Sequence, residues 1–490
     1  MKTTFWTRAI HLRYASSALS LLLAGCVSGP DHVAPQMPLP AKFGEGTIKS
    51  NGDIMTAQWW VGYRDPQLDS LVNRGLNQNL DVLQAFERIN SAYANVTVAG
   101  AGGLPGLSLG ASHTVSGEMG SRRTTIGATN TTGGEADASW LLDLFGQYRR
   151  SRESAIASLG AAHATADDAK LSLLKDLAST YIDARYYQER IALSRANLKS
   201  RQETYDLTQL QFGAGGASRL DIAQAEGLVQ STKSEIPDLE QSFTVSAHHI
   251  ATLLGLPASA LMDELRKSKG QPVYRGDIRA GIPADLIRNR ADIRKAEREL
   301  AEAVANIGVA EAQLYPSISL SGSIAPTWSK SAGSNGGSLT TWSFGPTLNL
   351  PIFDGGQLRA NVDIEKSDAK TQYLAWKAAV LNGVEEVENA LSAVHRDAQT
   401  LEPLRGQLKA AQESLALSTS SYKEGASSLL DVLDAQRSVS DAQASLAAAV
   451  QQVAKDYVDL YVAVGAGYLT GQGQGQGQGQ STSERTAKSS

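Results

Sequence analysis

The feature that most constrains this chain is an internal repeat with a period of about 210 residues. The sequence Phe-Gly-Gln-Tyr-Arg around Gln147 returns around Gln357 as Gly-Gly-Gln-Leu-Arg. The same offset of 210 carries Leu220-Asp221 onto Leu430-Asp431, and an offset of 211 carries Leu104-Pro105 onto Tyr315-Pro316. A period this long indicates two copies of one structural unit rather than a short-repeat solenoid. The 490 residues therefore predict two related halves of one body.

The composition excludes some classes of function. The net charge of -5 gives no basic surplus, so a nucleic acid is not expected as a partner. The chain has a single cysteine, Cys26, so no internal disulfide is possible. Beyond the N-terminus, no continuous apolar run is long enough for a membrane-spanning helix.

The N-terminus has the pattern of a secretory signal. Lys2, Arg8 and Arg13 precede an apolar stretch that ends at Cys26. The last four residues of that stretch, Leu-Ala-Gly-Cys, are similar to the lipobox of bacterial lipoproteins, which implies lipidation of Cys26 and no other cofactor. By the rule of those lipoproteins, Val27 after the cysteine implies sorting to the outer membrane. The alternative is an ordinary signal peptide with an incidental thiol.

Four segments alternate with a period of two and are predicted to be strands. They lie near 107–112, 136–143, 317–324 and 342–350, and each has one apolar face and one face of small polar residues. Loops rich in Gly, Ser, Thr and Asn near 117–132 and 329–337 would join them as two hairpins.

The residue types on the polar face of the predicted strands distinguish a soluble core from a water-filled lumen. A half-buried sheet of a soluble core would carry Lys and Glu on its outer face, whereas Ser, Gly, Thr and Asn suit a water-filled lumen. Four strands cannot close a membrane barrel, because the smallest have about eight. Three copies of the chain would supply twelve.

The remaining sequence predicts long helices. The stretch from Gln147 to Phe212 contains no proline, and the matching stretch from Gln357 to Tyr422 contains Pro403 alone. Apolar residues from Leu446 to Val464 step by four and three, which is the seam of a coiled coil. Helices this long have no globular core to face, so they are expected to pack laterally on each other.

Each long helix is predicted to end at a glycine turn and to return as a second helix. The turns are Gly213-Ala214-Gly215-Gly216 in the first half and the segment ending at Gly425 in the second. Ser218 is the expected N-cap of the first returning helix, and either Ser427 or Ser428 caps the second.

These motifs in combination resemble the outer membrane factor family, the TolC-like exit ducts, and the NodT-like lipoproteins within it. The resemblance extends from Cys26 to about Tyr468. Its motifs are Trp59-Trp60, Asp65-Pro66-Gln67-Leu68, Asn79-Leu80-Asp81, Asp143-Leu144-Phe145-Gly146, Phe353-Asp354-Gly355-Gly356, and the tip from Tyr422 to Gly425 followed by Leu429-Leu430-Asp431-Val432-Leu433-Asp434-Ala435.

The resemblance implies a homotrimer whose twelve-stranded transmembrane β-barrel continues as a periplasmic helical coiled-coil barrel. It implies an outer-membrane duct that works with a periplasmic adaptor and an inner-membrane pump. The tip glycines, Gly213, Gly215, Gly216 and Gly425, would meet the adaptor. The gate positions implied by the family are Asp221, Tyr422, Ser427, Asp431 and Asp434.

The acidic pair of the second tip fits a gate physically. Asp431 and Asp434 are three residues apart and share a helix face, so threefold symmetry would place six carboxylates around one axis. The alternative is that both are exposed acids in a first helical turn, favoured there by the helix dipole.

The chain departs from the family pattern at two places. Ser427 stands where TolC has an arginine, and a hydroxyl cannot form the same bidentate charged link. Arg219, beside Asp221, could supply a different one. Ala291 replaces the proline of an Arg-Pro-Asp-Ile-Arg motif, which would change a helix entrance without changing function.

No pattern of catalytic or metal-binding residues is found. His248 and His249 are adjacent and would project about 100° apart on a helix, which is poor geometry for a shared metal. No phosphate-binding loop with Gly-Lys-Ser/Thr occurs, so energy for transport would come from a partner.

The predicted organisation is a signal peptide over 1–25, a lipidated extension and equatorial segment over 26–69, two family repeats over 70–282 and 283–469, and a disordered Gly/Gln tail over 470–490. The predicted function is a passive, gated exit duct for small toxic compounds and not an enzyme. A type I protein-secretion duct and a non-conducting, lipid-anchored coiled-coil scaffold remain as alternatives.

Overall fold

The computed structural model describes residues 27–45, 57–119, 125–267, 269–276 and 283–469. The chain divides into two compact units. Of the described residues, the first unit comprises those within 27–36, 88–162 and 295–376, and the second comprises those within 37–87, 163–294 and 377–469. Each unit takes segments from both sequence repeats, so the compact units and the repeats divide the chain differently. The predicted signal peptide, Cys26 and the Gly/Gln tail lie outside the described residues.

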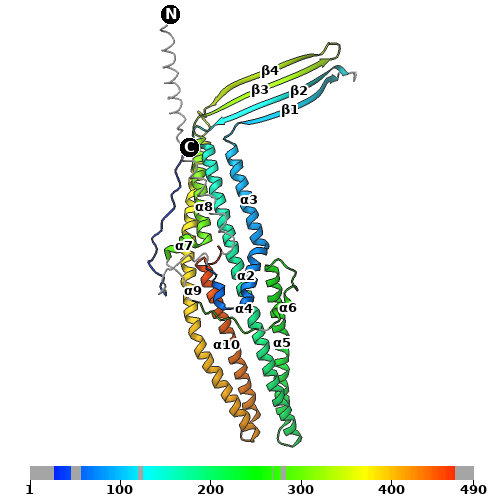
Figure 1. The fold of residues 1–490 in the computed structure, drawn as a ribbon, viewed down its shortest axis with the longest axis vertical. Helices are drawn as coiled ribbons and strands as arrows, with labels where there is room; N and C mark the ends of the chain where they lie inside the picture. The colour runs from blue at the N-terminus through cyan, green and yellow to red at the C-terminus, as the bar shows by residue number, and fades with distance from the viewer. Residues whose placement is uncertain (1–26, 46–56, 120–124, 268, 277–282, 470–490) are drawn as a thin grey trace. The chain divides into compact units, whose positions relative to one another are not determined.

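The first unit contains one antiparallel sheet in the order β1-β2-β3-β4, seen as four adjacent arrows in Figure 1. Its strands are β1 (Gly106–Met119), β2 (Thr125–Leu142), β3 (Ser317–Ser331) and β4 (Gly337–Asn349). The two predicted hairpins, β1-β2 and β3-β4, are both present. The pairing of β2 with β3 joins the first repeat to the second.

The sheet has the two faces that the alternation predicts. Leu109, Ala136, Ile324 and Trp342 lie opposite one another across all four strands and form an apolar row. The neighbouring row is Ser108, Asp137, Ser323 and Ser343, and the hydroxyls of Ser323 and Ser343 are 2.9 Å apart. Because successive side chains of a strand point to opposite faces, one face is apolar and the other small and polar.

The two loops predicted between the strands are longer than the observed ones. The stretch from Thr125 to Thr132 belongs to β2, although its Gly, Thr and Asn residues favour a turn. In the sheet, Asn130 faces Val115 on one side and Lys330 on the other, so the backbone forms ladders with two neighbours. Pairing on both sides outweighs the weak local preference of these residues. The same applies to the end of β3 at Ser331.

Four helices contribute residues to both units. They are α3 (Leu80–Ala101), α4 (Gln147–Gly213), α8 (Ala291–Ala312) and α9 (Gln357–Lys423). Within the first unit, α8 and α9 pack through small and β-branched side chains, namely Ala303, Ile307 and Ala369. Small side chains allow close lateral packing, as expected for helices without a globular core.

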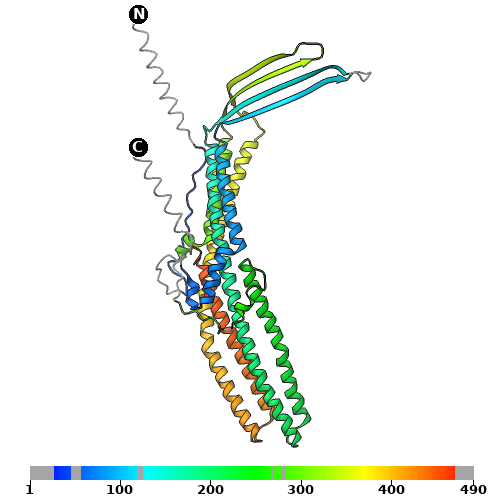
Figure 2. The same cartoon turned by 45° about the vertical axis from the view of Figure 1, so that its right-hand side comes forward.

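The second unit contains two helical hairpins. The helix α4 returns as α5 (Arg219–Leu253), and α9 returns as α10 (Leu429–Ala463). Figures 1 and 2 both show the two hairpins side by side. The two long helices end within a residue of the positions predicted from the sequence, at Gly213 and Lys423. Pro403 lies inside α9 without ending it.

Short elements of the second unit pack against these hairpins. They are the 3-10 helix η2 (Trp59–Tyr63), α2 (Pro66–Gln78), α6 (Met262–Leu265) and α7 (Pro283–Asn289). Trp60, Leu68 and Leu71 from the short elements are fully buried, as are Leu174, Leu177, Tyr181 and Ile250 from α4 and α5. Within the described ranges, no helix is both long enough and apolar enough to cross a membrane.

Candidate functional site

The two hairpin tips are built alike, one repeat apart. Gly215 and Gly425 adopt positive φ angles of 82° and 75°. The backbone N–H of Gly216 donates to Gln211 at 2.8 Å, and the N–H of Ala426 donates to Ser421 at 2.8 Å. These bonds close the end of each descending helix in the Schellman pattern, which needs a residue without a side chain at the left-handed position.

Each ascending helix starts with a capping box. The Ser218 hydroxyl accepts the N–H of Asp221 at 3.2 Å, and the Asp221 carboxylate accepts the N–H of Ser218 at 2.7 Å. Ser428 and Asp431 repeat this exchange at 3.4 and 3.0 Å. Of the two predicted caps for α10, Ser428 is therefore the cap. Ser427 is not, because its hydroxyl donates to the Ser418 carbonyl at 3.3 Å.

The predicted gate residues make their contacts within the chain. The carboxylates of Asp221 and Asp431 are engaged by their own capping serines. Asp434 pairs with Arg437 at 2.7 Å, and both side chains are more than half exposed. Tyr422 is buried with Ala225, Leu429, Val432 and Leu433, in a cluster that joins the two hairpins near their tips. Whether these residues close a gate between copies of the chain stays a prediction.

The two hairpins are also joined by buried polar contacts further along. Arg201 of α4 donates to Thr232 of α5 and, at 2.9 Å, to Ser440 of α10. Gln436 of α10 donates to Thr204 of α4 at 2.8 Å. Because buried polar groups lose their hydration, these partnered side chains fix the register between the two hairpins.

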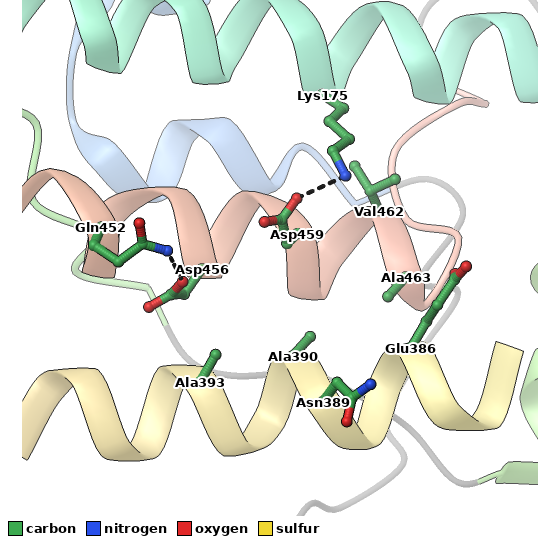
Figure 3. A pocket seen from close by; sticks show the side chains of 10 residues that line it. All are labelled: Lys175, Glu386, Asn389, Ala390, Ala393, Gln452, Asp456, Asp459, Val462 and Ala463. Carbon is green, nitrogen blue, oxygen red and sulfur yellow. Dashed lines mark hydrogen bonds and ion pairs between the residues drawn. The ribbon is translucent and has the colours of Figure 1, made fainter. Parts of the chain in front are cut away.

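A pocket of about 450 Å³ lies between α4, α9 and α10. Figure 3 shows Glu386 and Asn389 on α9 and Asp456 and Asp459 on α10, with Asp459 pointing toward Lys175 of α4. The Lys175 ammonium lies 2.9 Å from the Asp459 carboxylate. The pocket is therefore acidic, and one of its acids is neutralised by a lysine.

Asp456 is the unusual group of this pocket. It is 3% exposed, its Oδ1 accepts a hydrogen bond of 2.8 Å from Gln452, and its Oδ2 has no hydrogen-bond donor within the described part of the chain. Burial and the nearby carboxylate of Asp397 raise the pKa of Asp456 to about 6, although the bond from Gln452 acts to lower it. The sequence offered no sign of this group, since Asp397 and Asp456 are far apart in the chain.

The motif Asn289 to Arg294 borders the same region. Arg290 donates to Asp292 at 2.7 Å, to Glu386 at 2.7 Å and to the Ala463 carbonyl at 2.8 Å. The helix α8 begins at Ala291, so this alanine occupies the first helical position, where proline is equally acceptable. The helix starts at this alanine although the sequence predicts that the replacement changes the helix entrance; the expectation that function is unchanged stays a prediction.

The motif Asp65-Pro66-Gln67-Leu68 has a structural role. Asp65 caps α2 by accepting the Gln67 N–H at 3.0 Å, and it also accepts hydrogen bonds from Tyr181 and Lys269. Burial acts to raise the pKa of Asp65, but these three donors together hold that pKa below its usual value. Asn79 likewise caps the start of α3 through the Val82 N–H at 3.0 Å.

The segment that follows Cys26 packs on the first unit. The Ser28 N–H donates to the Phe145 carbonyl at 3.0 Å, and the side chain of Val27 lies against Gly146, just after the end of β2. Arg150, which is buried, donates to the carbonyls of Ser28 and Gly29, both at 3.0 Å. No feature of the sequence predicted this contact, which we call the N-terminal seat (Val27, Ser28, Gly29, Gly146 and Arg150).

Metal-binding side chains do not cluster within the described ranges: no group of three or more His, Cys, Asp or Glu residues is placed to hold an ion. His248 and His249 lie on α5, as the helical pattern predicts.

Comparison with known proteins identifies the family. The profile described as Outer membrane efflux protein matches the chain twice, over residues 71–256 and 282–466. The chain belongs to this family. The two matches confirm the internal repeat. Membership of this family also confirms the outer-membrane location expected from the sequence.

Curated relatives cover almost the whole chain. Nodulation protein T of Rhizobium leguminosarum bv. viciae is 60% identical over 456 residues, which are 93% of this chain and 94% of the relative. The Pyoverdine export outer membrane protein OpmQ of Pseudomonas aeruginosa is 31% identical and covers 91% of this chain and 95% of its own. The resemblance to NodT-like proteins is therefore confirmed.

Solved channels share the fold. The outer-membrane channel OprN superposes with a TM-score of 0.81 at 30% identity, covering 90% of this chain and 100% of its own. The open state of the Neisseria gonorrhoeae outer membrane channel MtrE gives a TM-score of 0.77 at 29% identity, covering 90% and 99%. The predicted fold class, a four-stranded contribution to a membrane barrel continued by long helices, is confirmed for this family member.

Proposed function

We propose that three copies of this efflux protein close into one passive duct, the outer-membrane exit of a tripartite efflux system. The observation that carries the proposal is the sheet. It has one apolar face, one face of small polar groups, and too few strands to close alone. Three sheets would make a twelve-stranded wall with lipid outside and water inside, which supplies the missing closure.

The proposed partners follow from what the duct lacks. The sequence contains no phosphate-binding loop, so the energy for transport comes from an inner-membrane pump. A periplasmic adaptor would join the pump to the hairpin tips, whose exposed glycine turns, around Gly215 and Gly425, are the parts of the chain free to receive it.

The proposed cargo is small molecules. Relatives that cover more than nine tenths of this chain are named for pyoverdine export and for toluene efflux, in Pseudomonas aeruginosa and Pseudomonas putida. These names favour small-molecule efflux over protein secretion. The pump, rather than the duct, is expected to choose among compounds.

The duct is proposed to be tethered by lipid at Cys26. Val27 rests against Gly146, four residues after the end of β2, so acyl chains on the preceding residue would lie near the membrane border of the sheet. Several acyl chains hold a protein to a bilayer where a single chain does not.

Conductance tests the duct directly. Purified full-length protein of trimer mass, added to planar bilayers, should give stepwise conductance. A folded trimer that never conducts, even with Asp431→Ala and Asp434→Ala, would contradict the duct and favour a non-conducting scaffold.

Accumulation tests the cargo. Deletion of the gene should raise the intracellular level of a fluorescent efflux dye, and the intact gene should restore the lower level. An unchanged dye level together with loss of a secreted protein would favour the secretion duct instead.

A further inference from the structure

The acids that line the pocket between α4, α9 and α10 are only partly neutralised by basic side chains. Arg290 lies 2.7 Å from Glu386, and Lys175 lies 2.9 Å from Asp459, so these two acids are paired. Asp456, the third acid of the lining, has no ion-pair partner among the described residues. The pocket therefore contains a negative charge without a counter-charge whenever Asp456 is ionised.

Asp456 is buried with one of its oxygen atoms unpartnered. Gln452 donates to Oδ1 at 2.8 Å, whereas Oδ2 accepts no hydrogen bond within the described part of the chain. In Figure 3 the carboxylate of Asp456 lies in the space between α10 and α9. An ionised carboxylate that is buried without donors loses its hydration and is not compensated. Such an oxygen atom indicates a place for a donor that the chain itself does not supply.

A second carboxyl group, that of Asp397 on α9, lies near Asp456. Burial and this neighbouring carboxyl group raise the pKa of Asp456 to about 6. Below that pH a proton on Asp456 removes the repulsion between the two groups. At higher pH the proton leaves, and a cation that brings its own hydrogen-bond donors can take its place. Asp397 is only partly buried, so its side chain can turn aside to admit such a cation.

The rest of the lining defines which kind of cation fits. Ala390 and Ala393 of α9 and Val462 and Ala463 of α10 offer only apolar groups to the pocket. Within the described ranges, no three His, Cys, Asp or Glu residues are placed to hold a metal ion, whereas Mg²⁺ and Ca²⁺ take about six oxygen ligands or more. An ammonium group on an aliphatic chain suits both parts of the lining, because its N–H groups donate to carboxylates and its methylene groups pack on apolar side chains.

We propose that this pocket binds an aliphatic ammonium ion, with the ammonium group against Oδ2 of Asp456, beside Asp397, and the alkyl chain along Ala390 and Ala393. Every residue of the lining belongs to the second unit of one chain, so the inference stands apart from the proposed duct. The bound cation joins α9 to α10 where the two carboxyl groups repel each other. It also stabilises the folded chain by mass action, because the unfolded chain has no such pocket.

Titration calorimetry of the purified full-length protein with butane-1,4-diamine at pH 8 tests the site. The amino groups of this probe stay charged at that pH, because alkylamines of this kind titrate near the pKa of lysine. We expect saturable binding and a higher melting temperature. Butane-1,4-diol, which has the same chain without the charges, should not bind. Sodium or magnesium chloride at matched ionic strength should not raise the melting temperature equally, and an equal rise would contradict an ammonium site.

Two variants separate the charge of the site from its shape. Asp456→Asn removes the unpartnered carboxylate and should weaken diamine binding at least about 10-fold. Ala393→Leu fills the apolar part of the pocket and leaves every acid in place, and it should weaken binding by a similar factor. Because Ala393 is only partly buried, the larger side chain is compatible with the fold, which circular dichroism would verify for each variant.

Glu413→Gln is the matched control for net charge. Glu413 is an exposed acid further along α9 and lies outside the pocket lining. Its replacement should leave the affinity for the diamine within about 2-fold of the native value, because exposed charges at this distance are largely screened. A loss of affinity in Glu413→Gln as large as that in Asp456→Asn would show that the diamine responds to overall charge, and would overturn the site.

Competition with protons gives a readout that a change of packing would not move. Asp456 is mostly protonated at pH 5 and mostly ionised at pH 8, so the affinity of the native protein should be about 10-fold higher at pH 8. In Asp456→Asn this dependence should disappear. Burial raises the pKa of Tyr63 and Tyr457 further above their ordinary value of 10.0, so these neighbours do not titrate in this range. The other charged groups around the site are Asp397, Asp459, Glu386, Lys175 and Arg290.

The outcomes distinguish this inference from the proposed duct. Absence of saturable binding to the native protein, or equal binding by the native protein, Asp456→Asn and Ala393→Leu, would overturn the site. Conductance measured on the same preparations tests the duct. A conducting protein that does not bind the diamine overturns this inference and leaves the duct standing, whereas a folded protein that binds the diamine and never conducts does the reverse.

Discussion

The carboxyl group of Asp397 on α9 lies close enough to the buried Asp456 of α10 to raise the pKa of Asp456. Glu386 of α9 and Asp459 of α10 add further negative charge, and Arg290 and Lys175 pair with those two acids. Two like charges this close favour retention of a proton between them. The contact between α9 and α10 is therefore sensitive to pH.

This acid pair predicts that the protein loses stability as the pH rises from about 4 to about 7. The folded pKa of Asp456, about 6, is above its ordinary value of 3.8, so the folded state holds a proton that the unfolded chain has released. The stabilising contribution is complete below 3.8 and is lost as the pH rises through about 6. Asp456→Asn, which stays uncharged, should melt about 2–4 °C above the native protein at pH 8 and equal it at pH 4.

Asp459→Asn is the control for the acid pair. Its carboxylate pairs with the half-exposed Lys175 and is the smallest of the causes that raise the pKa of Asp456, so its loss should change the melting temperature much less than Asp456→Asn does at any pH. Equal pH profiles for Asp456→Asn and the native protein, measured by circular dichroism, would rule out the shared proton.

The tip aspartates predict a difference in cation block. Asp434 is exposed and stands outside the capping box, so Asp434→Asn should weaken block of the conductance by a trivalent cation about 10-fold without loss of stability. Asp431→Ala should weaken block and also destabilise the tip by about 1 kcal/mol, because it removes a capping partner.

Asp221→Ala serves as the reference for the tip acids, since it removes the equivalent capping acid of the first repeat. The trivalent cation could block the native protein, Asp434→Asn and the double variant Asp431→Ala with Asp434→Ala equally. That result would contradict a ring of gate carboxylates and favour simple surface acids.

A tip glycine, Gly425, and a glycine inside a helix, Gly406, predict effects of opposite sign for the same substitution. Gly425 has a φ of 75°, so Gly425→Ala should destabilise the second tip by about 1–2 kcal/mol. Gly406 lies within α9, where an added Cβ meets nothing within 4 Å, so Gly406→Ala should stabilise by about 0.5–1 kcal/mol. Hydrogen exchange of the tip amides and thermal melting would measure both, and destabilisation by the two variants alike would contradict the assigned turn.

The N-terminal seat predicts that Gly146→Ala releases the segment after Cys26. A Cβ at Gly146 would lie 2.9 Å from the Cγ1 of Val27, whereas at Gly356, one repeat later, it would meet nothing within 4 Å. Both glycines have positive φ angles, of 82° and 91°, so Gly356→Ala controls for backbone strain. Proteolysis between residues 27 and 45 should be about 10-fold faster in Gly146→Ala than in Gly356→Ala. Equal rates would show that Val27 does not depend on this contact.

Features set by local sequence were predictable. The N-cap Ser218 was predicted, and Ser428 is one of the two N-caps that the sequence allows for α10; the ends of α4 and α9 follow from glycines that adopt positive φ angles. The alternation along the strands gave the two faces of the sheet, because the side-chain period of a strand is fixed. The extent of β2 was wrong, since pairing with two neighbours outweighs the turn preference of its residues.

Features set by distant contacts were not predictable. Asp397 and Asp456 look like ordinary surface acids of two helices until the hairpin brings them together. Arg150 looks like one of several basic residues at the start of a helix, and its burial under Ser28 and Gly29 depends on a segment more than a hundred residues away. Such groups carry no periodic or local signal, because burial and charge at these positions are set by packing.

The N-terminal seat distinguishes the two halves of the chain. Arg150 of the first repeat corresponds to Ala360 in the second. Gly29 packs against Gly308 of the second repeat, which corresponds to Thr97 in the first. The N-terminal seat therefore needs the arginine that only the first repeat has and the glycine that only the second repeat has. A ring of three chains would contain six similar repeats, and the N-terminal seat would occur at every second one. It would lie beside the pairing of β2 with β3 within each chain.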